Sequence, residues 1–252
     1  MQQFTTRAHP EQSVHSASGT PVVFVVDDDS TVRESLELLI RCEGWQAEVF
    51  ASAAEFLHQS RPRVPSCLVL NVSLPHLDGL ELQRLLGGEP ELPIIFMAGF
   101  ADVRTTVVAM KAGAFDFLTR PFADETLSSA IRHALEVSRS VMLEQAKIRA
   151  LRARYESLSP RQQAVMAGVV AGLLNKEVGR ELGISEGTVK VHRCSVMSRM
   201  HADSLPALVH MATMLDLKRP ASRIAFSTAN RPSSIRSAAF AAFIGPEIAA
   251  PQ

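Results

Sequence analysis

Three consecutive acidic residues, Asp27 to Asp29, directly follow a short apolar run. Asn71, Ala98 and Arg120 end or follow three further apolar runs. If these runs are parallel strands of one sheet, their carboxyl ends meet at one edge, which is where ligands of such sheets collect. Adjacent carboxylates repel one another, and a hard divalent ion such as Mg²⁺ would relieve that repulsion. The sequence therefore predicts an acidic crevice with Asp27 and Asp28 as candidate metal ligands.

The elements that must position these residues alternate between strands and helices. Runs rich in Val, Ile and Leu predict strands at 22–26, 47–50, 67–70, 94–97 and 115–118. Helical spacing of apolar residues predicts helices at 31–42, 53–59, 80–86 and 103–112. This alternation is typical of an α/β domain, with a five-stranded parallel sheet that is doubly wound and covered on both faces.

After Pro121 the pattern is entirely helical. A long helix is expected from residue 124 to about 155, and Ser138 and Gln145 interrupt its apolar stripe, so a dimer seam and a plain solvated connector both stay open. Ser159-Pro160 has the composition of a new helix start. Helix, turn and helix are then expected over 175–180, 182–185 and 186–200. The predicted organisation is a disordered arm (1–20), an α/β domain (21–123), a helical linker (124–156), an all-α domain (157–217) and a flexible basic tail (218–252).

The composition is that of a globular protein with two small domains. The chain has 252 residues, 46% of them hydrophobic and 21% charged, which excludes collagen, a coiled-coil rod and a wholly disordered chain. The longest candidate membrane segment, 238–245, is far shorter than the roughly 20 residues that a span needs. We therefore expect a cytoplasmic protein with no membrane partner. The three cysteines are far apart in the sequence, which favours buried small side chains over disulfides or a clustered metal site.

The charges of the two halves are opposite although the whole chain is neutral. Residues 21–123 hold 8 basic and 14 acidic residues, a net −6, whereas residues 124–252 hold 17 and 11, a net +6. Such asymmetry fits an ion-binding or regulatory half joined to a half that binds nucleic acid. The all-α domain itself holds only 6 basic against 5 acidic residues, so modest DNA affinity per monomer is expected.

The acidic half resembles the receiver domain of bacterial response regulators of the FixJ/NarL type. The resemblance rests on the strings VVDDDSTVRESL, LVLNVSLPHLDGLEL and AMKAGAFDFLTRPF and on their spacing. It implies a flavodoxin-like fold in which an acid pair binds Mg²⁺, an Asp accepts a phosphoryl group, a Thr or Ser senses it and a Lys neutralises it. On this chain the acid pair is Asp27 and Asp28, and Phe117 matches the family's mobile aromatic residue, although a simply buried Phe is the other interpretation.

The remaining positions of this pocket depart from the family pattern. Asn71 stands where the phosphoacceptor Asp is expected, and an amide oxygen is a poor nucleophile. Ala98 replaces the sensing hydroxyl, and Arg120 replaces the lysine with a larger, forked cation. We therefore expect Mg²⁺ binding to be weak or lost, with Arg120 able to occupy the place of the ion. Whether such a pocket resembles the active or the inactive state stays open.

The helical half resembles the LuxR-type DNA-binding domain. The string LSPRQQAVMAGVVAGLLNKEVGRELGISEGTVKVHRCSVMSRM carries this resemblance over about 45 residues. It implies that helix 186–200 enters the major groove of duplex DNA and that dimers meet through the last helix. The base-edge candidates are Lys190, Val191, Arg193 and Cys194, and the phosphate candidates are Asn175, Lys176, Thr188, His192 and Arg199.

The leading interpretation is a DNA-binding transcriptional regulator that works without phosphorylation and is not an enzyme. Promoter DNA and a second copy of the chain are the expected partners, RNA polymerase is a candidate partner, and a histidine kinase stays an open question. A conventional phosphorelay regulator phosphorylated on Asp27, Asp28 or Asp29 remains the main alternative. A Mg²⁺-dependent phosphotransfer enzyme with Asp27 as nucleophile is the third, and it would leave the helical half unexplained.

Overall fold

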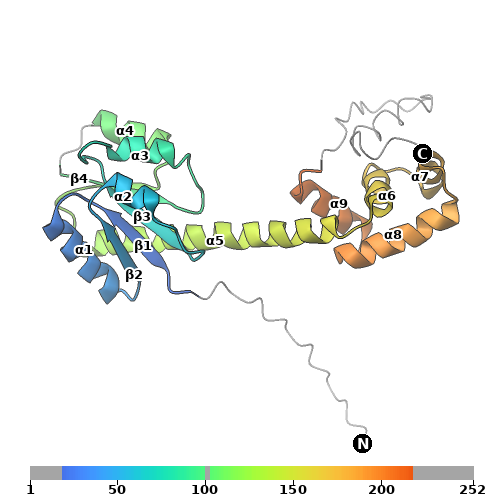
Figure 1. Cartoon of the computed structure of the whole chain (residues 1–252), viewed down its shortest axis with the longest axis horizontal. Coiled ribbons are helices and arrows are strands. Elements are labelled where there is room, and N and C mark those ends of the chain that lie inside the picture. Colours follow the sequence, from blue (N-terminus) through green and yellow to red (C-terminus); the bar gives the residue numbers. More distant parts are fainter. Residues whose placement is uncertain (1–18, 100–102, 218–252) are drawn as a thin grey trace, which may run out of the picture. The chain divides into compact units, whose positions relative to one another are not determined.

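The computed structural model describes residues 19–99 and 103–217 (Figure 1). The chain divides into two compact units, residues 1–144 and 145–252, and each is described by itself below. The predictions for the N-terminal arm and the C-terminal tail concern segments that, apart from residues 19 and 20, lie outside the described residues. Within 19–99 and 103–217, no helix is both long and apolar enough to cross a membrane.

The first unit is the predicted five-stranded parallel sheet. Its strands are β1 (Val22–Val26), β2 (Gln46–Phe50), β3 (Ser66–Asn71), β4 (Ile94–Ala98) and β5 (Asp116–Thr119). They lie in the order β2-β1-β3-β4-β5, and each neighbouring pair is parallel. The helices are α1 (Ser30–Cys42), α2 (Ala53–His58), α3 (Gly79–Leu85), α4 (Val103–Lys111) and the first part of α5 (Asp124–Glu156).

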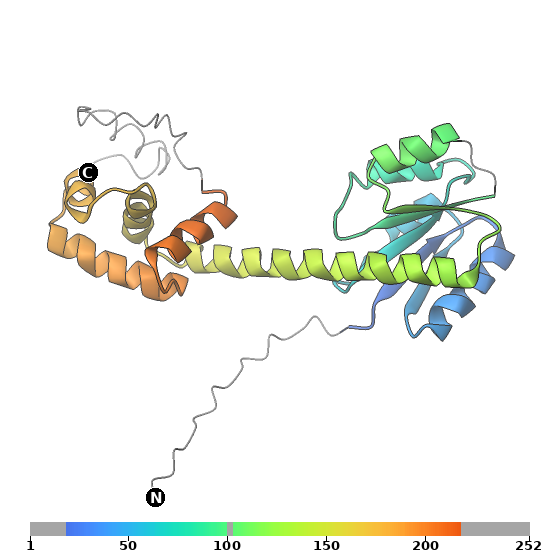
Figure 2. The ribbon, with the colours of Figure 1, turned by 180° about the vertical axis from the view of Figure 1, so that it is seen from behind.

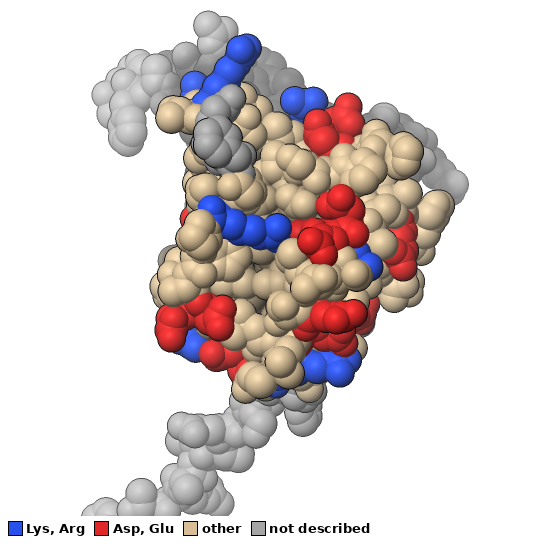
Figure 3. Space-filling model, turned by 90° about the vertical axis from the view of Figure 1, so that its left-hand side faces the viewer, with Lys and Arg blue, Asp and Glu red and all other residues tan. Residues whose placement is uncertain are grey.

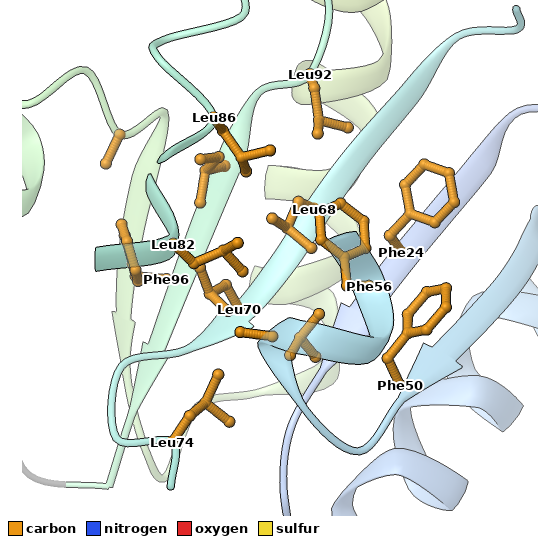
Figure 4. Packing of buried hydrophobic residues seen from close by; sticks show 14 of the residues in the cluster. Phe24, Phe50, Phe56, Leu68, Leu70, Leu74, Leu82, Leu86, Leu92 and Phe96 are labelled. Carbon is orange, nitrogen blue, oxygen red and sulfur yellow. The ribbon is translucent and has the colours of Figure 1, made fainter. Parts of the chain in front are cut away.

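Two apolar clusters cover the two faces of the sheet because side chains alternate along each strand. Phe24 and the residues two positions before and after it, Val22 and Val26, point to the face that α2, α3 and α4 cover. Figure 4 shows this packing around Phe24, Phe56 and Leu82. Val23 and Val25 point to the opposite face, under α1 and α5, which Figure 2 shows from behind. Cys67 lies in this second cluster, and burial raises the pKa of its thiol, as expected for a structural cysteine. The expectation of buried cysteines is wrong for Cys42 and Cys194, which are exposed on helices.

A buried serine fastens α5 to the sheet. Ser138 is fully buried, and its hydroxyl accepts from the backbone N–H of Ser66 at 3.0 Å and donates to the carbonyl of Glu91 at 2.6 Å. Both partners lie near the amino-terminal ends of strands, far from Ser138 in the sequence. The polar residue that interrupts the apolar stripe of α5 therefore satisfies two backbone groups that would otherwise be unpaired.

The second unit is entirely helical within its described part. After the end of α5 follow α6 (Pro160–Val170), α7 (Asn175–Leu182), α8 (Glu186–Met200) and α9 (Leu205–Met214). Ser159 caps α6 through a capping box with Gln162, with Pro160 in the first turn, as the sequence indicates. The core of this unit includes Leu151 near the end of α5, with the half-buried Tyr155 packed against it. Burial raises the pKa of the Tyr155 phenol above its ordinary value.

Candidate functional site

The predicted site residues lie at the carboxyl ends of four neighbouring strands. Asp27 follows β1, Asn71 ends β3, Ala98 ends β4 and Arg120 follows β5. Parallel pairing of β1 with β3, β3 with β4 and β4 with β5 brings these strand ends to the same edge. On the face of this unit that Figure 3 shows, a group of acidic side chains lies directly beside a basic one.

All three oxygen atoms of Asp27 accept hydrogen bonds from within the chain. The carboxylate is 1% exposed, and its Oδ2 accepts from Nη2 of Arg120 at 2.7 Å. Its Oδ1 accepts from the backbone N–H of Asp29 at 3.0 Å. Its backbone carbonyl accepts from Nη1 of Arg33, in α1, at 2.7 Å. The ion pair with Arg120 supplies the charged hydrogen-bond partner that a buried carboxylate requires.

The second acid of the pair is held by the residue in the acceptor position. Nδ2 of Asn71 donates to Oδ1 of Asp28 at 3.2 Å, and Oδ1 of Asn71 accepts from the backbone N–H of Ser73 at 3.3 Å. Asn71 is 9% exposed, whereas Asp28 is exposed. The third acid, Asp29, has a local role as the N-cap of α1, where it accepts from the backbone N–H of Thr31.

Two described residues add apolar surface beside these polar groups. Ala98 is buried and accepts the backbone N–H of Arg120 through its carbonyl at 2.8 Å. Phe117 is partly buried and lies 6.1 Å, centroid to centroid, from Phe96. Gly79 lies so close to β3 that an added Cβ would come within 2.6 Å of the carbonyl oxygen of Asn71. The wall therefore carries no side-chain hydroxyl at the Ala98 position.

These residues do not fit a divalent ion. Mg²⁺ prefers carboxylate and carbonyl oxygens with free lone pairs. Each oxygen of Asp27 already accepts one N–H, and the amide of Asn71 turns its NH₂ group toward Asp28. The guanidinium of Arg120 adds a positive charge directly beside the carboxylate that the ion would need. Across 19–99 and 103–217, no group of three or more His, Cys, Asp or Glu is arranged to hold a metal ion.

In the helical unit, α7, a tight turn and α8 form the predicted helix-turn-helix. Gly183 ends α7 with a left-handed backbone (φ 66°), a conformation that glycine adopts without strain. Ser185 caps α8 by accepting from the backbone N–H of Thr188. Gly179 allows the two helices to approach, because a Cβ there would lie 2.8 Å from the carbonyl oxygen of Ile184 in the turn.

Helix α8 buries one side and exposes the other. Val189, Val196 and Met200 are its buried residues. The opposite side carries exposed candidate base contacts, and Val191 is 69% exposed although it is apolar. Helical spacing of three and four residues places Val191 and Cys194 together on this outer side.

The other DNA-contact candidates differ in how they are held. Nη1 of Arg193 donates to Oδ1 of Asn175 at 3.3 Å and so links α8 to the start of α7. Lys190 pairs with Glu186 one turn earlier at 3.2 Å. Arg199 donates to the backbone carbonyl of Ser157 at 2.9 Å, which ties the end of α8 to the segment that precedes α6. Lys176 and Thr188 are exposed, and His192 is half-buried.

Comparison with known proteins agrees with both units. Residues 23–132 match the model of the response regulator receiver domain, and residues 156–212 match that of the bacterial regulatory proteins of the luxR family. Nodulation protein W of Bradyrhizobium diazoefficiens is 46% identical over 202 residues, covering 80% of this chain and 89% of that protein. The chain belongs to the response regulators.

Two further relatives agree with this assignment. The transcriptional regulatory protein FixJ of the same organism is 40% identical to this response regulator over 191 residues, which cover 75% of this chain and 93% of FixJ. A solved structure of the response regulator StyR is 40% identical, covers 77% of this chain and 99% of its own, and superposes with a TM-score of 0.68. This response regulator therefore has a receiver domain and a LuxR-type DNA-binding domain, and it is a transcriptional regulator and not an enzyme. The fold prediction is confirmed.

Some residues of this response regulator that shape the two sites were missed by the sequence reasoning. Arg33 reaches the Asp27 carbonyl from α1, and Met97 lies 3.8 Å (Sδ) from Nη2 of Arg120. Gly79 and Gly179 are required by close backbone approach. The available signals were a glycine at the start of α3, Gly79, and one inside α7, Gly179. A sequence alone does not tell which other backbone segment approaches such a glycine.

Proposed function

We propose that this response regulator controls transcription through sequence-specific DNA binding that does not depend on phosphorylation of its receiver domain. The observation that carries the proposal is Asn71 at the end of β3, in the acceptor's place, with its amide bonded to Asp28. An aspartyl phosphate forms when a carboxylate oxygen attacks phosphorus and the donor's leaving group departs. The amide oxygen of Asn71 shares its electrons with nitrogen and is too weak a nucleophile for that step.

Two further features of the pocket support the same proposal. Ala98 has no hydroxyl that would bond a phosphoryl oxygen, so a phosphoryl group would lack its sensing partner. Arg120 is already bonded to Asp27, so its charge is committed to a carboxylate. In this proposal the receiver serves as a fixed dimerisation or protein-binding module.

The decisive experiment measures phosphoryl transfer and DNA affinity on the same full-length protein. After incubation with acetyl phosphate and Mg²⁺, intact-mass analysis is expected to find no added phosphoryl group, and operator affinity is expected to change by less than about twofold, within ordinary scatter. The matched control restores the family pattern with Asn71→Asp, Ala98→Thr and Arg120→Lys, and it is expected to take up phosphoryl. Phosphoryl found on Asp27, Asp28 or Asp29 of the unaltered chain, together with tighter operator binding, would establish the phosphorelay alternative.

For the DNA-binding domain we propose that α8 lies in the major groove with Val191 and Cys194 toward the base edges. The other proposed base contacts are Lys190, which is exposed, and Arg193, which is half-buried and bonded to Asn175. Asn175, Lys176, Thr188 and His192 are proposed phosphate contacts. The bond from Arg199 to the Ser157 carbonyl favours a structural role for that residue over a phosphate contact.

A specific prediction concerns Val191, whose apolar side chain is 69% exposed on the proposed reading face. The methyl group of thymine is the apolar feature of the major groove, and burying one methyl-sized group contributes ~0.8 kcal/mol, or about fourfold in affinity. In an operator selected from random DNA, replacing the contacted thymine by uracil is expected to weaken binding about fourfold by that estimate.

A double-mutant comparison isolates this contact. Val191→Ala is expected to bind the thymine and uracil operators equally, because the methyl group then has no partner. Fluorescence anisotropy at fixed salt gives all four affinities. An equal thymine preference in the unaltered chain and in Val191→Ala would assign the methyl contact elsewhere.

The proposed assembly is a homodimer that meets through α9 and recruits RNA polymerase. Dimerisation would double the DNA contacts of a domain whose net charge, with 6 basic and 5 acidic residues, is only slightly positive. Analytical ultracentrifugation with and without operator DNA tests the dimer.

A further inference from the structure

Among the residues that the structure describes, the buried carboxylate of Asp27 pairs with one charged side chain. It is 1% exposed, and the guanidinium of Arg120 reaches it at 2.7 Å from the end of β5. Arg120 itself is anchored by the backbone, since its N–H donates to the carbonyl of Ala98 at 2.8 Å. The pairing of β4 with β5 thereby positions the guanidinium beside the Asp27 carboxylate.

We propose that the Arg120 guanidinium is a built-in cation that closes a latent divalent-ion site formed by Asp27 and Asp28. The inference rests on the proposed function, because it explains how the pocket keeps one state without phosphoryl transfer. It differs from that function in naming Arg120, and not Asn71, as the residue that excludes the ion.

The hydrogen bonds around Asp27 show which of its oxygen atoms Arg120 withholds from a metal ion. Each of its oxygen atoms accepts one N–H: from Asp29, from Arg120 and from Arg33. The donors on Asp29 and Arg33 serve Oδ1 and the backbone carbonyl, so Oδ2 is the oxygen that would be released if Arg120 were removed. The exposed Asp28 is bonded at Oδ1 by a neutral amide, which does not repel a cation by net charge.

Electrostatics favour the internal cation while it is present. A guanidinium attached to the chain neutralises Asp27 and, unlike a bound metal ion, cannot dissociate from the protein. A divalent ion would have to displace this group from a buried position and then lie next to its charge. Removal of the Arg120 charge leaves two adjacent carboxylates without that cation, the situation in which a hard ion binds.

The test measures Mn²⁺ binding to the full-length protein by electron paramagnetic resonance, with Mg²⁺ competition. The unaltered chain is expected to bind no Mn²⁺ in the pocket at millimolar metal. Arg120→Met is expected to bind Mn²⁺ at concentrations at least about tenfold below the highest one at which the unaltered chain shows no binding, since one repelling charge next to the ion is gone. Mg²⁺ is also expected to raise the melting temperature of Arg120→Met and to leave that of the unaltered chain unchanged.

Three further variants make the outcome unambiguous. Arg104→Met removes an exposed arginine of α4 and is expected to behave like the unaltered chain. Arg120→Gln keeps an N–H donor for Asp27 without the charge, so it replaces Arg120→Met if that variant does not fold. Adding Asp28→Asn to either Arg120 variant is expected to abolish the gained Mn²⁺ binding.

The inference falls if the unaltered chain binds Mn²⁺ as tightly as the Arg120 variants, or if folded Arg120→Gln binds none. Neither result bears on the proposed function, which falls only if the unaltered chain takes up phosphoryl and then binds its operator more tightly. The two proposals can therefore fail separately.

Discussion

Replacement of Gly179 by Ala is expected to weaken operator binding strongly. The added Cβ would lie 2.8 Å from the carbonyl oxygen of Ile184, which belongs to the backbone of the turn and cannot rotate away. The same turn is held by the N–H of Ile184, which donates to the carbonyl of Gly179 at 2.9 Å. The clash must therefore be relieved by moving α8 away from α7, at an overpacking cost of about 1–3 kcal/mol.

A displaced reading helix loses several contacts together. Each good base contact contributes about 1–3 kcal/mol of discrimination, so the loss of two corresponds to an affinity drop of about thirtyfold or more. Fluorescence anisotropy on a selected operator measures this drop. Gly187→Ala is the matched control for folding, because its Cβ meets only the Ser185 Oγ at 3.7 Å, and circular dichroism should find that variant at least as stable as the unaltered chain. Operator binding by Gly179→Ala at the unaltered level would refute the close-approach argument.

Truncation of Leu151 to Ala is expected to destabilise the helical unit by about 2–5 kcal/mol. Leu151 lies in the last turns of α5, before the predicted domain start at 157, yet it is 6% exposed and belongs to the core of the second unit. Two hydrogen bonds also reach this segment: Gln163 donates to the carbonyl of Tyr155, and Arg199 to that of Ser157. The end of α5 is therefore part of the fold of the DNA-binding unit.

The loss should appear as an earlier melting transition of the helical unit alone. For a unit of this size, about 2 kcal/mol corresponds to a shift of roughly 10 °C. Hydrogen exchange followed by mass spectrometry separates the helical peptides from those of the α/β unit. Leu174→Ala makes the same chemical change in the same unit at a residue that is 70% exposed, and it is expected to shift the transition little. Equal shifts for both variants would argue against a structural role of the α5 end.

The secondary structure and the fold could be predicted because both depend on local periodicity. The runs around Phe24 and Leu68 alternate in a way that fills two apolar clusters, and the intervening helical stretches supply the covering layers. Strand ends were less certain: β3 extends one residue further at each end than predicted, through Ser66 and Asn71, and β5 begins one residue later than predicted, at Asp116. Boundaries depend on hydrogen bonds to neighbouring strands, which a single sequence does not display.

The candidate site was predictable where its residues end strands, and not where partners come from elsewhere. Asp27, Asn71 and Arg120 could be expected to meet because parallel strands share an edge. The contact of Arg33 with the Asp27 carbonyl depends on the rotamer of a helix side chain, and that of Ser138 with Ser66 joins residues 72 apart in the sequence. Neither pairing leaves a periodic signal, because long-range polar contacts are determined by the packed fold.

The pairing of Arg120 with Asp27 makes single substitutions in this pocket costly. Asn71→Asp alone would set a third carboxylate beside Asp27 and Asp28 while the guanidinium still bars a metal. Loss of Arg120 alone would leave the carboxylate of Asp27, which is 1% exposed, without its charged partner. Removal of one partner from a buried pair costs about 3–5 kcal/mol. Each of these single changes is therefore expected to give a less stable protein, so the ion pair couples the composition of this pocket to the stability of the α/β unit.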